Sequence, residues 1–224
     1  MGFKRLFLFP DNEKFEIKDT IIALVYYCFI LVALYFVGRI YYSTGKYWGS
    51  YMNAIIMLIP VILCFKNLSK TGITKKNLLP ALLWGSAIGV IVLMSICIVP
   101  GIIHHWRVMP GSKILNYFFY YFIIIALSEE ISFRGFIQPR LFPVFKKEWL
   151  VILVGGILFV LMHYPFQMTM RGMSFADYWP YFISGAPFQF LWHLAFTFLY
   201  RKFGNIWGGT MLHGFVDMSQ GIFF

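Results

Sequence analysis

Long apolar runs separated by short polar segments divide the chain into a series of predicted helices. A stretch of about 17–25 apolar residues is enough to cross the hydrocarbon core of a bilayer as a helix. The pattern predicts such stretches at about residues 19–42, 48–65, 78–99, 113–136, 148–164, 180–200 and 205–221. We therefore expect an all-α polytopic bundle with about seven transmembrane spans.

The same pattern divides the chain into three parts. Residues 1–18 combine cations with Phe and Leu, which is typical of an amphipathic lead at the lipid headgroups. Residues 19–112 hold the first three predicted spans. Residues 113–224 hold spans four to seven and form the predicted protease-like core.

Composition supports a membrane protein. The 224 residues are 60% hydrophobic and only 12% charged, whereas soluble domains carry roughly 25% charged residues. A chain with so few charges cannot cover its own surface with polar groups, so the lipid bilayer is its expected surrounding.

The lysines and arginines lie mainly in alternate connecting segments. With the N-terminus inside, the inner cations are Lys4, Arg5, Lys14, Lys18, Lys66, Lys70, Lys75, Lys76, Arg140, Lys146, Lys147, Arg201 and Lys202. The outer cations are Arg39, Lys46, Arg107, Lys113 and Arg171. This bias follows the positive-inside rule and predicts a multi-pass protein of the cell membrane with a cytoplasmic N-terminus. The formal net charge of +10 is thus explained by topology, and nucleic acid is not an expected partner.

A few ionisable side chains interrupt the apolar spans. They are Glu129, Glu130, Arg134, His163, His193, His213 and Asp217. A charged group at membrane depth costs about 2.5–3.5 kcal/mol on insertion scales and usually marks a functional site. We expect this group to face the interior of the bundle.

Helical spacing indicates which of these groups can act together. Glu130 and Arg134 are four residues apart and can form an ion pair on one helix face. Glu129 is rotated by about 100° from Glu130, which leaves it free to act as a base. An ion pair that only joins two spans is an equally good interpretation of Glu130 and Arg134.

His213 and Asp217 are also four residues apart. Together they could position a water, bind a metal or stabilise an oxyanion, or they could form a buried hydrogen bond that only stabilises the bundle. His163 and His193 are single histidines on apolar faces, where most histidines are core residues, and we interpret His193 as a packing residue.

Oxygen and nitrogen donors suited to Zn²⁺ are present in Glu129, His163, His213 and Asp217. They come from three separate spans, and the chain has no HExxH motif. From the predicted boundaries, Glu129 lies roughly 10 Å and His163 roughly 22 Å from the inner ends of their spans. If these residues meet, a predicted span end is wrong or a helix is tilted or broken.

Three ordered motifs resemble the CPBP family, which includes CAAX prenyl proteases of the second type, bacteriocin-processing enzymes and Abi-type membrane proteins. The motifs are Glu129-Glu130-x-x-x-Arg134, Phe159-x-x-x-His163 and His213-x-x-x-Asp217. The resemblance covers about residues 126–217 and implies an all-helical membrane endopeptidase that cleaves a peptide bond in or at the edge of the bilayer.

The resemblance also implies roles for the motif residues. Glu129 with His163 would activate the attacking water, and the third motif would stabilise the tetrahedral oxyanion. Glu130 with Arg134 would support the site. The family is described as metallopeptidases, although a metal-free, glutamate-dependent mechanism has also been proposed, so zinc stays open.

One residue departs from the family pattern. The third motif commonly ends in asparagine, whose amide can donate to an oxyanion, and here it ends in Asp217. An ionised aspartate would repel the oxyanion, so Asp217 must be protonated, bind a metal or orient His213.

These observations favour an intramembrane endopeptidase acting on a membrane-associated peptide or protein, with lipidated proteins, bacteriocins and signal peptides as candidate substrates. The alternative is a non-catalytic protein that binds a peptide or provides bacteriocin immunity. A transporter with a carboxylate proton relay is a third reading that nothing in the sequence favours.

Overall fold

The computed structural model describes residues 15–219 and 221–223, and within them the regular structure is helical, without strands. The predicted all-α class is therefore confirmed. Residues 1–14 of the predicted lead lie outside the described residues. The elements are α1 (Ile17–Thr44), α2 (Gly49–Met57), α3 (Ile59–Leu63), η2 (Leu68–Thr71), α4 (Leu78–Leu93), η3 (Met94–Ile98), α5 (Val99–Ile103), α6 (Gly111–Phe119), η4 (Tyr120–Leu127), α7 (Ser128–Glu130), η5 (Ile131–Ile137), η6 (Gln138–Leu141), α8 (Phe142–Phe145), α9 (Glu148–Met170), α10 (Phe175–Phe203) and α11 (Trp207–Met218).

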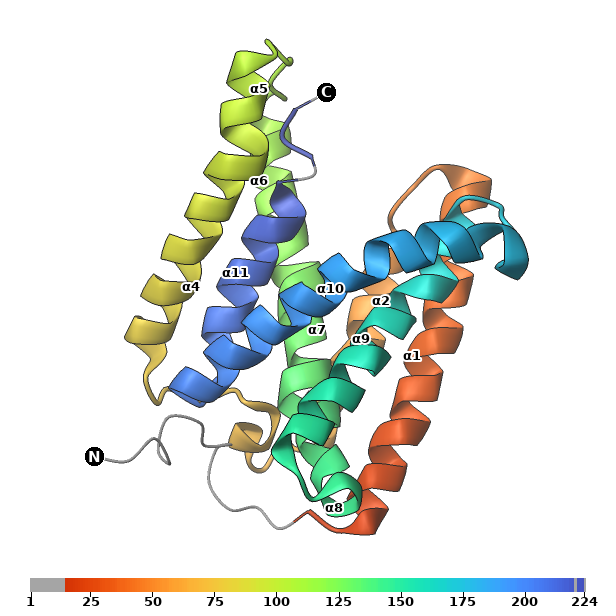
Figure 1. Ribbon diagram of the computed structural model, residues 1–224, viewed down its shortest axis with the longest axis vertical. Coiled ribbons are helices and arrows are strands. Elements are labelled where there is room, and N and C mark those ends of the chain that lie inside the picture. The colour runs from red at the N-terminus through yellow and green to blue at the C-terminus, as the bar shows by residue number, and fades with distance from the viewer. Residues whose placement is uncertain (1–14, 220, 224) are drawn as a thin grey trace.

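The helices surround one central run, which extends from α6 through α7 to α8 (Figure 1). On one side of this run α11 packs against α4, and on the other side α1 packs against α9. Helix α10 crosses the bundle obliquely and contacts both α9 and α11. The central run therefore faces helices from both halves of the chain.

Several helices are long and apolar enough to cross a membrane, which supports a multi-pass membrane protein. Among the described residues these stretches are Ile17–Thr44, Leu78–Ile103, Gly111–Phe145, Glu148–Met170 and Phe175–Phe203. The second predicted span is instead a shorter apolar stretch, Gly49–Leu63, with a break at Leu58 between α2 and α3. The seventh is α11, with 12 residues. Five crossing helices are thus supported, and a count of seven stays a prediction.

The helix that contains the fourth predicted span is longer than the pattern predicts. The pattern ends the span at about residue 136, whereas the helical run continues to Phe145. Pro139 and Pro143 are tolerated because each lies within the first two residues of a new helical turn, where a missing N–H removes no helical hydrogen bond. The Arg140 guanidinium is accommodated as well, since it donates to the Phe136 carbonyl oxygen at 3.0 Å and lies 3.7 Å from the Phe136 ring.

This extension corrects the predicted depths. Glu129 lies 16 residues before Phe145, or about 24 Å along a helix. His163 lies 15 residues after Glu148, or about 22 Å along its own helix. Because α9 also continues past Pro165 to Met170, both residues lie well inside their helices and at the same level.

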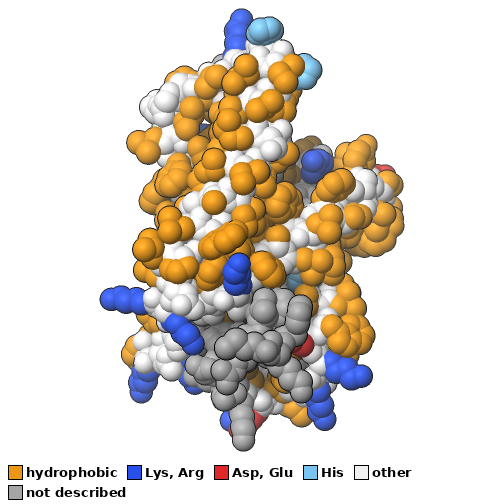
Figure 2. Space-filling model, turned by 60° about the vertical axis from the view of Figure 1, so that its left-hand side comes forward, with side chains coloured by type: hydrophobic (Ala, Val, Ile, Leu, Met, Phe, Trp, Pro, Cys, Tyr) orange, Lys and Arg blue, Asp and Glu red, His pale blue; other side chains and the backbone are white. Residues whose placement is uncertain are grey.

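The surface separates apolar and basic regions. Apolar side chains cover most of the view in Figure 2, and lysines and arginines gather toward its lower end. Large side chains such as Leu83, Ile91 and Leu191 are exposed on the helix faces, as expected for contact with lipid. The cation-rich segments before α4, before α9 and at the end of α10 lie at the same end of the bundle, and which compartment they face stays a prediction.

Two glycines bring α4 and α11 into close contact. A Cβ atom at Gly85 would lie 2.2 Å from the carbonyl oxygen of Gly208, and one at Gly89 would lie 2.5 Å from the Phe215 ring. Small residues at such a crossing let helix backbones approach closely, which is how membrane helices commonly associate. This contact fixes α11 beside the central run.

We predict that Gly85→Ala lowers the free energy of unfolding by about 1–3 kcal/mol, because the added methyl group overpacks the contact with Gly208. Thermal or denaturant unfolding of the purified protein in detergent measures the change. Gly185→Ala is the matched control, since a Cβ atom there meets nothing within 4 Å. Equal stability of the two variants would contradict the close contact between α4 and α11.

Candidate functional site

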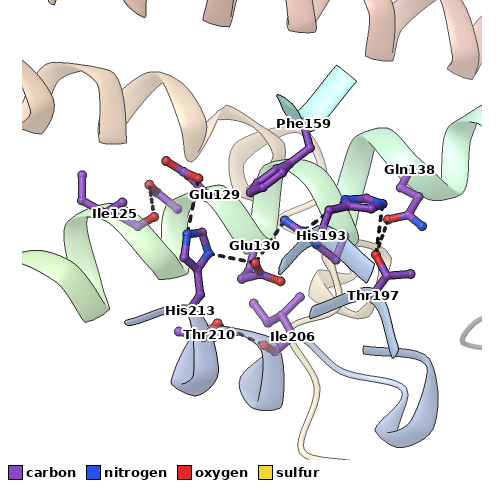
Figure 3. A network of polar contacts seen from close by, with 12 residues as sticks. Ile125, Glu129, Glu130, Gln138, Phe159, His193, Thr197, Ile206, Thr210 and His213 are labelled. Carbon is purple, nitrogen blue, oxygen red and sulfur yellow. Dashed lines mark hydrogen bonds and ion pairs between the residues drawn. The ribbon is translucent and has the colours of Figure 1, made fainter. Parts of the chain in front are cut away.

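The two glutamates lie between π-helical segments of the central run. The segments η4 and η5 flank α7, which carries Glu129 and Glu130. A π-helical turn holds more residues than an α-helical turn, and such segments are frequent at functional sites. Both glutamates approach the same histidine, one at each of its ring nitrogens (Figure 3).

His213 lies between carboxylates on both edges of its ring. Its Nδ1 is 3.0 Å from Glu130 Oε1. Its Nε2 is 3.7 Å from Glu129 Oε2 and 3.5 Å from Asp217 Oδ2. An ionised carboxylate can only accept, so the Nδ1–H of His213 donates to Glu130. This leaves Nε2 directed toward the other two carboxylates.

The ion pair expected from the spacing of Glu130 and Arg134 is present. Glu130 Oε1 is 3.1 Å from Arg134 Nη1, and both side chains are completely buried. The guanidinium lies 4.2 Å from the Phe159 ring centroid and 5.1 Å from that of Phe196, so both aromatic faces contribute cation–π attraction. Phe159 of the second motif thus contacts the cation of the first motif.

His163 lies beside the same aromatic ring. Its ring centroid is 5.1 Å from that of Phe159, which is 6.1 Å from that of His213. His163 Nδ1 is 2.8 Å from the carbonyl oxygen of Phe159. A carbonyl only accepts, so Nδ1 carries the proton and the Nε2 of a neutral ring is left as an acceptor.

The cluster is closed at one end and open at the other. The exposed fraction of the side chain is 0% for Glu130 and Arg134, 5% for His213, 11% for Glu129 and 21% for Asp217. Water or a peptide would therefore reach the cluster from the side of Asp217 and Glu129. The six predicted site residues thus lie close together, in contact with one another or with the Phe159 ring.

Several residues of the site were not found from the sequence. His193, interpreted as packing, lies with Nδ1 3.2 Å from Arg134 Nη2. Phe196 stacks on His213 with ring centroids 4.5 Å apart. Gly209 leaves room for Glu130, because a Cβ atom there would lie 2.6 Å from Oε2. The sequence carries no signal for these contacts, since each joins residues on different helices.

The candidate zinc ligands do not form a ready metal site. Among the described residues, no three His, Cys, Asp or Glu side chains are arranged so that they could hold a metal ion. His213 turns both nitrogens toward carboxylates, and His163 uses Nδ1 within its own helix. A catalytic zinc site needs three protein donors directed at one point, with a fourth position open to water. The expectation of zinc stays a prediction, and no step below depends on it.

We predict that Arg134→Met lowers the free energy of unfolding by about 3–5 kcal/mol, because it leaves Glu130 buried without its cation. Adding Glu130→Gln should recover part of that loss, since the uncompensated charge is then removed as well. Denaturant unfolding in detergent measures both variants. Arg39→Met, on the exposed face of α1, is the control and should change stability by less than about 0.5 kcal/mol. If Arg134→Met is as stable as the wild type, then leaving Glu130 without its cation does not destabilise the protein.

Comparison with protein families matches residues 111–219 to the family described as type II CAAX prenyl endopeptidase Rce1-like. The matched range runs from the start of α6 to just past α11 and contains all three motifs. Neither the curated proteins nor the solved structures give a match. Residues 111–219 therefore match the model of this endopeptidase family, which confirms the resemblance carried by the three motifs.

Proposed function

We propose that the protein is an intramembrane endopeptidase that hydrolyses a peptide bond of a membrane-associated protein or peptide. The family match supports endopeptidase activity at the level of the family. The observation that carries the detailed proposal is the placement of His213 between a buried, paired glutamate and a glutamate at the open edge of the cluster.

Glu129 is the proposed general base. Its Oε2 has no hydrogen-bond partner among the described residues, and its side chain lies toward the open end of the cluster. Glu130, by contrast, contacts both Arg134 and His213. Glu129 can therefore accept a proton from water, and the free Nε2 of His163 is the proposed second acceptor that orients that water.

The proposed reaction follows from these positions. Glu129 removes a proton from water while the water oxygen attacks the carbonyl carbon, and the carbonyl oxygen becomes an oxyanion. A protonated His213 donates from Nε2 to the oxyanion, and Glu130 stabilises its positive charge through Nδ1. The intermediate then collapses as Glu129 returns its proton to the leaving nitrogen. The water supplies the hydroxyl of the new carboxyl group and one hydrogen of the new amine.

Asp217 is proposed to act as a neutral acid. Three carboxylates and two cations, Arg134 and His213, would leave the buried cluster with one excess negative charge, which is costly at low dielectric. One proton on Asp217 makes the cluster neutral. The resulting O–H can donate to the oxyanion, as the amide of the asparagine more common in this motif would.

The substrate is proposed to be held by the bilayer next to the open end of the cluster. The family supports a peptide substrate in the membrane. Lipidated proteins, bacteriocin precursors and signal peptides each carry an apolar group that would confine them there, and they are the substrates to test first.

We predict that Glu129→Gln and His213→Ala each abolish cleavage of a membrane peptide by the purified protein in liposomes. The first variant removes the base, and the second removes the proposed oxyanion donor. Peptide products are measured by mass spectrometry, with and without a chelator. Glu16→Gln, which changes an exposed carboxylate at the start of α1, is the control and should cleave like wild type.

The same experiment distinguishes a metal-dependent protease, a glutamate-dependent protease and a non-catalytic peptide-binding protein. Activity lost on chelation and restored by Zn²⁺ would establish a metal requirement. Cleavage that survives Glu129→Gln would refute the proposed base. A wild-type protein that binds peptide without cleaving it would support the alternative of a peptide-binding or immunity protein.

We predict that Asp217→Asn keeps cleavage activity within about tenfold of wild type, because an amide N–H can replace a carboxyl O–H as donor. Asp217→Ala removes the donor and should lower kcat by about 100-fold or more. The asparagine variant should also keep its activity to higher pH than wild type, since an amide has no proton to lose. Loss of activity in Asp217→Asn equal to that in Asp217→Ala would mean that Asp217 acts as an ionised group.

A further inference from the structure

His193 lies at the closed end of the cluster, in the interior of α10. Its side chain is completely buried. Nδ1 is 3.2 Å from Arg134 Nη2, and Nε2 is 3.2 Å from the carbonyl oxygen of Ile152. Gly156 of α9 allows this approach, because a Cβ atom there would lie 2.9 Å from His193 Cδ2. The imidazole therefore joins α10 to both the central run and α9.

The neighbours of His193 determine which nitrogen carries the proton. A guanidinium has only donors, so Nδ1 must accept from Arg134. A carbonyl only accepts, so Nε2 must carry the hydrogen that Ile152 receives. His193 is thus neutral with its proton on Nε2. A second proton would place a cation against Arg134 and remove the acceptor that Arg134 uses.

A further residue fits this assignment. The hydroxyl of Thr197 donates to Gln138 Oε1 at 3.3 Å, which leaves the Thr197 oxygen, 3.4 Å from His193 Nε2, as an additional acceptor. Figure 3 shows this part of the network on the side of Glu130 away from His213. Both nitrogens of the imidazole ring thus have a partner of the required kind.

Arg134 is held on two edges and two faces. Nη1 lies 3.1 Å from Glu130 Oε1, and Nη2 lies 3.2 Å from His193 Nδ1. The rings of Phe159 and Phe196 lie over the guanidinium carbon. Glu130 in turn accepts from His213. A continuous chain of contacts therefore runs from His193 through Arg134 and Glu130 to His213.

We infer that His193 is a positioning residue for peptide-bond hydrolysis, an inference that rests on the proposed function. Its Nδ1 fixes the guanidinium of Arg134, and Arg134 fixes the carboxylate of Glu130. That carboxylate sets the orientation of His213, so Nε2 of His213 points to the open side where the peptide carbonyl would lie. His193 itself contacts no substrate.

The alternative is that His193 only stabilises the bundle. Two substitutions distinguish the two roles. His193→Asn keeps a carbonyl oxygen close to the position of Nδ1, so Arg134 retains an acceptor. His193→Leu fills a similar volume and offers none. A purely structural role predicts that folded protein of either variant has the same kcat.

The test measures kcat and KM for a peptide whose cleavage depends on Glu129, using full-length protein in detergent. We expect His193→Leu to lower kcat by about 10–100-fold, the usual effect of losing a residue that orients a catalytic group, with KM unchanged. His193→Asn should stay within about fivefold of wild type. Wild-type kcat in folded His193→Leu would overturn the inference.

A second measurement does not depend on activity, and its first part needs only the wild-type protein. In ¹⁵N-histidine-labelled wild-type protein, we expect His193 to give the spectrum of a neutral ring with its proton on Nε2. His193→Leu should shift the Nδ1 resonance of His213, and His193→Asn should leave it in place. A protonated His193, or one with its proton on Nδ1, would refute the inference. If no peptide is cleaved but these resonances behave as expected, the proposed function fails while the positioning of His213 by His193 stands.

Discussion

The buried ion pair between Glu130 and Arg134 is the interaction on which the rest of the site depends. Both groups are fully excluded from solvent, and an unpaired charge in such surroundings costs several kcal/mol. One contact between them would leave most of their donors and acceptors unused. His213 therefore supplies a second partner to Glu130, and His193 supplies one to Arg134. Neutralising a single buried pair thus brings α10, α11 and the central run together at one point.

The same pair gives two adjacent glutamates different environments. Glu130 is held by a cation at the closed end, whereas Glu129 lies nearer the open edge with an oxygen that forms no hydrogen bond among the described residues. Environment rather than residue type commonly decides which of two carboxylates acts as base and which as electrostatic support. Because Glu130 accepts from Nδ1 of His213, the other nitrogen of that ring is directed toward Glu129. The contact that helps to neutralise the buried Glu130 therefore also orients His213 for the proposed reaction.

Contacts within one helix could be predicted from the sequence, and contacts between helices could not. Spacing by four residues predicted the Glu130–Arg134 pair and the approach of Asp217 to His213, and both are present. His193 contacts Arg134 although the two residues are 59 positions apart in the sequence. No periodic pattern along the chain predicts a contact between residues that far apart. The approach of both Glu129 and Glu130 to one histidine could not be predicted either, because His213 lies on another helix.

The helix of the fourth span extends beyond its predicted end for a related physical reason. Hydropathy assigns a charged residue or a proline to a loop because it assumes that water satisfies the polar group. Here the Arg140 guanidinium is satisfied by the Phe136 carbonyl and ring, and Pro139 is the second residue of η6, where a missing N–H is tolerated. The helix can therefore continue to Phe145. Because these polar groups are satisfied within the protein, hydropathy alone does not locate the end of this helix.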